Sequence, residues 1–423
     1  MDPIWQNRMD ALTAQLDATA SQLANSPSPS NDALLALTQS LQTFGPDQFH
    51  FFMKGFTTNQ LLPAMKLPAE HVLRATLDQI AFDLTLIRRI YQQRQETGGQ
   101  ATLTQADKLA QAGLDVAVQA GLLPQTAVLT YFNKSANIRI IPYAPLALVG
   151  LPYTATHADL DFLAIPHEVG HYVYHHAPGL AAHLHAHIPL YPEWANHWLE
   201  EIFADVYGTL VAGPVAGLSL QSLLRDNAQA QFVADDGEHP VDAVRPYIHS
   251  TVLRQLNNSK AADALDAAWE AELARRHWPT QFLPHNSHSP ADLAQARTLL
   301  EQTAVSLLTY LQTNRLLSQP KPWSTDHQDL AKLQANFTTW LTRPLKVDHY
   351  LLTAVGPEIG VATNGGPAQN LRAKGSTQTW RDWFKAQARQ NPTVPLPYQA
   401  WRPIFTSGHW PVKGPEGNSD GGI

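Results

Sequence analysis

Residues 165–176 read Ile-Pro-His-Glu-Val-Gly-His-Tyr-Val-Tyr-His-His, and the interpretation of the whole chain starts from this stretch. Residues four apart on an α-helix lie one turn apart on the same face, so His167 and His171 can present both imidazoles to one metal ion. Glu168 is rotated to the side of that face, where its carboxylate can reach a water on the metal without binding the metal. The spacing therefore predicts a metal site on a helix, with a general base beside it.

Histidine and carboxylate are the expected metal ligands, because the 423 residues include 19 histidines and no cysteine. The lack of cysteine excludes disulfides, cysteine-based zinc fingers, iron–sulfur clusters and thiol nucleophiles. Nine of the histidines fall within the 41 residues from His157 to His197. A metal site would explain part of this crowding.

A third ligand is expected from a neighbouring element, as His, Glu or Asp. The metzincin pattern is excluded, because it needs Gly and His at positions that hold Tyr174 and Ala177. A carboxylate is available 30 residues after the second histidine of the motif, at Glu201. Glu201 and Asp205 share a helical face, and the neighbouring Glu200 stays open as an alternative ligand.

Other histidines near the motif have competing interpretations. His175 lies four residues after His171 and could extend the ligand set to three histidines, although three successive turns of a straight helix rarely converge on one ion. His183, His185 and His187 are expected in an exposed loop without helical period. The alternative for these three is a substrate rim or a second, weaker metal site.

Together the two motifs resemble those of the gluzincin metallopeptidases, the thermolysin-like clan. The pattern Glu201-x-x-Ala204-Asp205 is most similar to the prenyl-protein and heat-shock membrane proteases of that clan. The resemblance covers residues 167–205 and implies that Glu201 is the third ligand. It also implies that Asp205 accepts the outer N–H of a ligand histidine. This chain lacks the transmembrane helices of those proteases, so their substrates are not carried over.

The ligand set implied by this resemblance predicts the chemistry of a hydrolase. Zinc held by His167, His171 and Glu201 would keep a fourth position for water and lower the pKa of that water toward ~7. Glu168 would take the proton of this water and pass it to the leaving amine. We therefore expect one zinc ion per chain.

A second electrophile is needed to stabilise the oxyanion. His239-Pro240-x-x-x-x-Arg245 resembles a segment that contributes to the substrate cleft in some of these families, so His239 ranks first. Arg245, Tyr247 and His249 are the other candidates. His197 is expected just behind the metal ligands.

Hydrophobic periodicity predicts helices along most of the chain and three short strands in its middle. The expected helices span 68–96, 159–177, 193–212 and 289–317, the last with Ser289 as its N-cap. The expected strands span 128–131, 138–141 and 147–151, with a turn at 133–137. Pro166 implies that the metal helix either starts close to this residue or follows a turn. The strand at 147–151 is expected to bind an extended peptide by strand addition.

These elements predict a mainly α-helical fold with a small β-sheet, an α+β zincin-like core between helical N- and C-terminal regions. The expected regions are 1–125 (N-terminal helices), 126–260 (catalytic core), 261–411 (C-terminal helices) and 412–423 (a disordered tail). Six of the 11 tryptophans lie in the C-terminal third and are interpreted mainly as core and lid packing.

Composition limits the partners and the location. Lys and Arg total 29 against 36 Asp and Glu, a net charge of −7, which argues against a nucleic-acid partner. The sequence has no apolar run of about 18 residues and no signal peptide at its start, so we expect no membrane span and a cytoplasmic protein.

The leading hypothesis is a zinc metallopeptidase that acts on a peptide or protein substrate. One alternative is a zinc hydrolase of a non-peptide amide or ester. The other is a helical interaction module that binds a metal without catalysis.

Overall fold

The computed structural model describes residues 2–313, apart from residues 140, 142, 158 and 226 and the segments 59–67, 189–191 and 277–279. The prediction of a mainly α-helical fold with a small β-sheet is confirmed. The predicted tail at 412–423, the six C-terminal tryptophans and most of the predicted region 261–411 lie outside the described residues. No helix among the described residues is long and apolar enough to cross a lipid bilayer.

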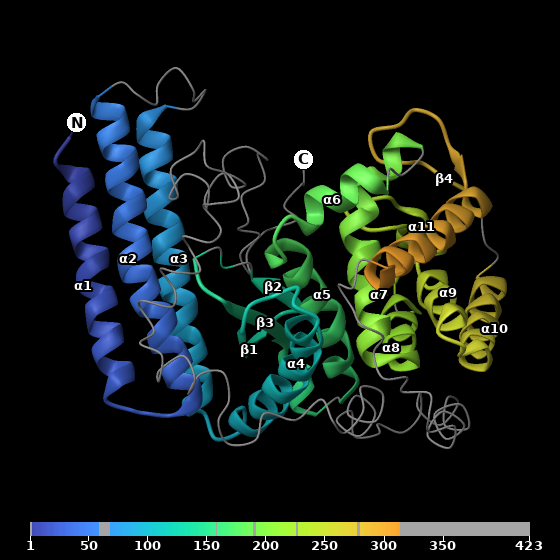
Figure 1. Ribbon diagram of the computed structural model, residues 1–423, viewed down its shortest axis with the longest axis horizontal. Coiled ribbons are helices and arrows are strands. Elements are labelled where there is room, and N and C mark those ends of the chain that lie inside the picture. The colour runs from blue at the N-terminus through green and yellow to red at the C-terminus, as the bar shows by residue number, and fades with distance from the viewer. Residues whose placement is uncertain are drawn as a thin grey trace.

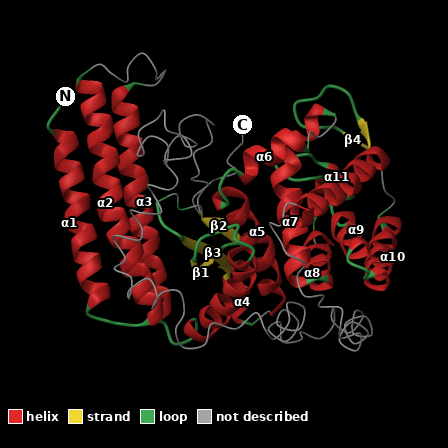
Figure 2. Cartoon of the chain, in the orientation of Figure 1, coloured by secondary structure: helices red, strands yellow, loops and turns green. Residues whose placement is uncertain are grey.

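The described residues form eleven α-helices, which dominate both views of the chain (Figures 1 and 2). They are α1 (Ile4–Ala24), α2 (Pro29–Thr57), α3 (Ala69–Gln95), α4 (Gln100–Gln119), α5 (Ile165–His176), α6 (Leu180–His187), α7 (Leu199–Ala212), α8 (Pro214–Arg225), α9 (Tyr247–Gln255), α10 (Ser259–Arg275) and α11 (Leu293–Thr313). The predicted helix at 68–96 is thus confirmed as α3.

The three predicted strands are also confirmed, as β1 (Ala127–Asn133), β2 (Asn137–Arg139) and β3 (Leu146–Pro152). Their order is β1-β3-β2, with β1 parallel and β2 antiparallel to β3. The expectation that residues 147–151 add a peptide strand is therefore wrong, because β3 is central and both of its edges are already paired. The strand next to α5 with an outer edge is β2.

Helices cover both faces of this sheet (Figure 1). Side chains alternate along a strand, so Leu146 and Leu148 of β3 enter a core shared with α1–α3, whereas Ala147 and Val149 enter a core shared with α4, α5 and α7. The predicted boundary at residue 125 stays a prediction. In the structure, α4 nevertheless packs against α5 and α7, with Gly113 facing them.

The two helices predicted at 159–177 and 193–212 both begin as 3-10 turns, over Asp159–Ala164 and Glu193–Trp198. Pro166 lies in the first turn of α5, where its missing N–H would have no helical partner. Both sequence alternatives for Pro166 therefore hold together: a turn leads into the helix, and the helix starts beside the proline.

Two local predictions are wrong. The segment of His183, His185 and His187 is the helix α6 and not a loop, because Ala and Leu fill the remaining positions and favour a helix. The C-terminal helix starts at Leu293 and not near Ser289. Residues Ala291–Asp292 pair as β5 with Gln281–Phe282 (β4), and Oδ1 of Asp292 accepts the N–H of Ala294 at 2.7 Å, which caps the helix.

Among the described residues, the most extensive contact between two helices is that of α5 with α7. A Cβ at Gly170 would lie 2.8 Å from Cα and 3.1 Å from the carbonyl oxygen of Ala204. Both atoms belong to the backbone, so the helices could accommodate a side chain only by moving apart. Gly170 therefore sets the separation of α5 and α7.

We predict that Gly170→Ala destabilises the protein by about 1–3 kcal/mol through overpacking, and weakens metal binding because α5 moves away from α7. Urea unfolding and a zinc titration measure the two effects. Gly113→Ala is the matched control, since its Cβ would meet Val211 at an ordinary 3.5 Å. Equal stability of the two variants would contradict the account.

Candidate metal centre

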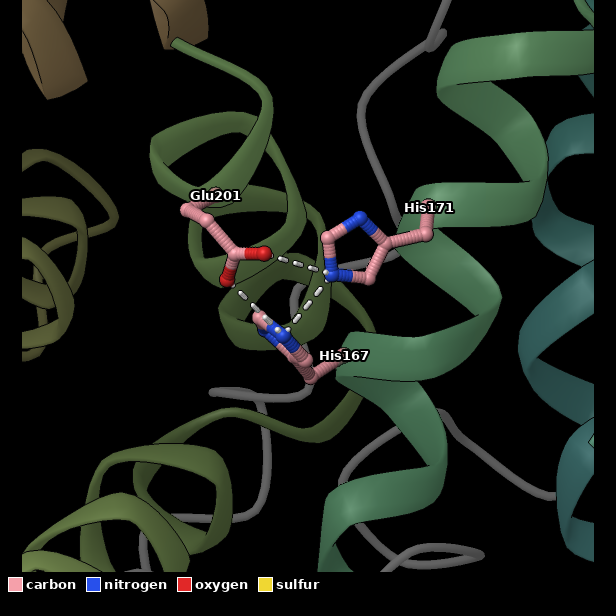
Figure 3. Close-up of side chains that lie close together, drawn as sticks. All are labelled: His167, His171 and Glu201. Carbon is pink, nitrogen blue, oxygen red and sulfur yellow. Dashed lines mark hydrogen bonds and ion pairs between the residues drawn. The ribbon is translucent and has the colours of Figure 1, made fainter. Parts of the chain in front are cut away.

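Three side chains from α5 and α7 converge on one point (Figure 3). Nε2 of His167 and Nε2 of His171 are 3.0 Å apart, and Glu201 places its two oxygens 3.4 Å and 3.3 Å from these nitrogens. Four donors around zinc at about 2.0–2.1 Å would be separated by roughly 3.3 Å. The group could therefore hold a metal ion.

The outer nitrogens of both histidines face carboxylates. Nδ1 of His167 lies 2.9 Å from Oδ1 of Asp205, within ion-pair distance, and Nδ1 of His171 donates to Oε1 of Glu200 at 2.9 Å. A carboxylate on the outer nitrogen fixes the tautomer, so that the other nitrogen carries the lone pair that a metal requires. Each ligand histidine is thus oriented by its own acid.

Without a metal, a proton takes its place. Two imidazole lone pairs 3.0 Å apart repel each other unless one of them is protonated. Burial opposes the charge on His167, but Asp205 and Glu201 prevail and raise its pKa to about 10. A metal that binds here therefore has to displace a proton.

Glu200 is the site residue whose role the sequence did not reveal. Its Oε1 accepts hydrogen bonds from His171 and, at 2.7 Å, from Nε2 of His175. Burial opposes its charge, but the two hydrogen bonds lower the pKa of Glu200 to about 2. Neither Glu200 nor His175 belongs to the converging group, so both alternative ligand assignments fail. The sequence signal for this role was the position of Glu200, which lies about 100° around the helix from Glu201 and so cannot share its face.

Arg245 is buried against the carboxylates of Glu201 and Asp205. Its guanidinium donates to Oδ2 of Asp205 at 2.7 Å and to Oε2 of Glu201 at 2.9 Å, and the residue is 5% exposed. Burial opposes the charge of both acids, but Arg245 keeps the pKa of each well below its usual value. The assignment of Arg245 as an oxyanion electrophile is therefore corrected: it is the counter-ion of the ligand carboxylates.

His239 contacts the group from a partly exposed position. Its Nε2 is 3.5 Å from Oε1 of Glu201, and its side chain is 43% exposed. Asp236 holds the imidazole, since Oδ2 accepts from Nδ1 at 2.8 Å and Oδ1 accepts from the backbone N–H of His239. The Asp three residues before the histidine was the sequence signal for this turn.

His249 is not part of the converging group. It is buried, with Nδ1 2.6 Å from Oγ1 of Thr209 and Nε2 3.7 Å from Oδ1 of Asp205. Burial lowers the pKa of His249 to about 4. Its role is to pack beneath Asp205.

Tyr247 and His197 also lie outside the converging group. The ring of Tyr247 is buried and covered by the guanidinium of Arg297, 3.5 Å from the ring centroid. Nε2 of His197 is 3.7 Å from Oδ1 of Asp235. Neither of these two assignments to the site is supported by the contacts.

Glu168 is buried beside the ligands and has no hydrogen bond or ion pair within the described part of the chain. Burial raises the pKa of Glu168 above its usual value, although the neighbouring His167 and His171 oppose this shift. A carboxylate without a structural partner and with a raised pKa is suited to accept and return a proton.

No protein-family model, curated protein or solved structure matches this chain. The likeness to gluzincins therefore remains an expectation drawn from two short motifs. The geometry of the side chains carries the functional argument.

We predict that Glu200→Gln weakens zinc binding about 10- to 100-fold, because the amide is a poorer acceptor for Nδ1 of His171. Competition with a chromophoric chelator measures the affinity. Glu270→Gln is the control, because its side chain is 58% exposed and belongs to α10, a helix that lies apart from α5 (Figure 1). Equal affinities for the two variants would remove Glu200 from the site.

We predict that Arg245→Met destabilises the metal-free protein by about 3–5 kcal/mol, since it leaves two buried carboxylates without a cation. Zinc should recover part of this loss, because it restores positive charge next to Glu201. Thermal melting with and without zinc tests both statements. Arg254→Met is the control, as its ion pairs with Asp263 and Asp266 are partly exposed. A loss no greater than that of the control would contradict the role of Arg245.

Proposed function

We propose that this protein is a zinc-dependent metallopeptidase. The observation that carries the proposal is the combination of a three-donor group on α5 and α7 with an unpaired, buried carboxylate at Glu168. A site that only stabilises the fold would close the coordination sphere with a fourth protein ligand. Here His167, His171 and Glu201 are the whole group among the described residues, which leaves a position for water or substrate.

Zinc is the metal that the donors favour. Two imidazoles and one carboxylate form a typical catalytic zinc set, whereas magnesium and calcium prefer oxygen donors alone. When bound, zinc would act as a Lewis acid and lower the pKa of a coordinated water toward ~7. His167, His171 and Glu201 would hold the ion.

Two residues of the chain would have separate roles in hydrolysis, Glu168 in proton transfer and His239 in stabilising the oxyanion. Glu168 takes the proton from the attacking water and passes it to the nitrogen of the leaving amine. His239, held by Asp236 through Nδ1, donates from Nε2 to the oxygen that gains negative charge. Burial opposes protonation of His239, but Asp236 and Glu201 raise its pKa, so the imidazole is suited to donate.

The sheet supports a peptide as the substrate. The outer edge of β1 is closed by side chains: Gln93 bonds both the N–H and the carbonyl of Phe132, and Asp107 accepts the N–H of Thr130. β2 is the other edge strand of the sheet, and it contacts α5. A peptide that pairs with β2 would run along the helix of the metal group.

We predict that Glu168→Gln abolishes peptide hydrolysis while zinc stays bound in full. The amide has the shape of the acid but cannot carry a proton between water and amine. Mass spectrometry of a library of unstructured peptides measures cleavage, and elemental analysis measures zinc. Glu270→Gln is the control and should cleave like the wild-type chain.

Two outcomes would count against the proposal. Cleavage that survives Glu168→Gln would show that another residue is the base. Zinc-loaded wild-type protein that cleaves no peptide would favour another amide or ester as the substrate, or a metal site without catalysis.

A further inference from the structure

A buried carboxylate, Asp235, begins the turn that carries His239. Its side chain is 0% exposed, which is unfavourable for an acid unless hydrogen-bond donors surround it. Oδ1 accepts from Nε1 of Trp198 at 3.2 Å and from the backbone N–H of Gly237 at 3.0 Å. Oδ2 accepts from the backbone N–H of His285 at 2.9 Å. Asp235 therefore joins three segments of the chain at one point.

The bond from Trp198 connects this turn to the helix of a metal ligand. Trp198 is buried and directly precedes α7, and Glu201 follows it by three positions. Nε2 of His239 reaches the same Glu201, at 3.5 Å from Oε1. The bond between Asp235 and Trp198 is thus a second connection between the turn of His239 and the start of α7.

Residues 283–285 pack along the same turn. Ala234 pairs with Leu283 in an isolated β-bridge, one position before Asp235. Gly237 has φ 82°, in the left-handed region that glycine adopts without strain. A Cβ at Gly237 would lie 2.8 Å from two ring carbons of His285. The turn is therefore held tightly on this side as well, and Asp235 is the side chain that links both segments to Trp198.

We propose that Asp235 is a positioning residue for His239, which it fixes relative to the ligand Glu201. This inference rests on the proposed function, in which His239 donates to the oxyanion. Asp236 orients the ring of His239 through Nδ1, whereas the three hydrogen bonds of Asp235 fix the turn as a whole. An oxyanion donor acts only within hydrogen-bond distance of the oxygen, so a small displacement of the turn lowers kcat.

Steady-state kinetics of peptide cleavage by the zinc-loaded full chain test this role. Asp235→Ala should lower kcat about 10- to 100-fold, because the donor is displaced and not removed. KM and zinc affinity should not change, since the three ligands stay in place. Asp266→Ala is the matched control, because Asp266 is a buried acid on α10 that pairs with Arg254. The control should lose stability and keep its kcat.

Two milder variants keep the test decisive if Asp235→Ala does not fold. Asp235→Asn retains one acceptor oxygen, so its kcat should lie between those of the wild-type chain and Asp235→Ala. Trp198→Phe leaves the acid in place and removes only the Nε1–H donor, so it should also lower kcat without weakening zinc binding.

A double-variant cycle separates positioning from a merely structural role. If Asp235 acts through His239, Asp235→Ala causes no further loss of kcat in a chain that already carries His239→Ala. Amide hydrogen exchange of residues 236–239 gives a readout that needs no activity. It should be faster in Asp235→Ala than in the wild-type chain and in Asp266→Ala.

Losses of kcat that multiply in the double variant would overturn the inference, and so would unchanged hydrogen exchange of residues 236–239. A wild-type chain that cleaves no peptide would contradict the proposed function instead. In that case faster exchange in Asp235→Ala still supports the placing of the turn by Asp235, and unchanged exchange overturns it.

Discussion

The contact of α5 with α7 is the constraint on which the rest of the site depends. Gly170 lets the backbone of α5 approach Ala204 within the distance that a Cβ would occupy. At this separation the two histidines of α5 and Glu201 of α7 come within 3.0–3.4 Å of one another. Gly170 is thus as important for the candidate site as His167, His171 and Glu201, because it allows the spacing at which these three residues could hold a metal ion.

Charge balance is the second requirement of this arrangement. Glu201 and Asp205 are both buried, and isolated buried carboxylates are unfavourable. The ion pairs with Arg245 offset the unfavourable burial of these two carboxylates. A proton on His167, or a metal ion held by the group, would add further positive charge next to them. Asp205 and Glu200, in turn, face the outer nitrogens of His167 and His171. Asp205 therefore takes part both in the ion pair with Arg245 and in the contact that orients His167.

The spacing of residues along the sequence predicted which side chains share the face of one helix. It did not predict contacts between side chains of different helices, which depend on tertiary packing. The pairs His167/His171 and Glu201/Asp205 followed from helical periodicity alone. The bond from Glu200 to His171 and the burial of Arg245 behind the ligands depend on how α5, α7 and α9 pack, which one helix does not reveal. The strand order is a further case, because the pattern of β3 fits an edge strand as well as the central one. In α6, the alternation of His183, His185 and His187 led to the prediction of a loop. The Leu and Ala residues between them were the better indication of a helix.

X-ray absorption at the zinc edge, on the chain loaded with one equivalent of zinc, tests the central claim most directly. The account predicts about four donors at ~2.0–2.2 Å, of which two are imidazole nitrogens and the others are oxygens. The imidazole scattering should disappear in His167→Ala/His171→Ala. A first shell without imidazole, or an unchanged spectrum in that double variant, would contradict the assignment of the site.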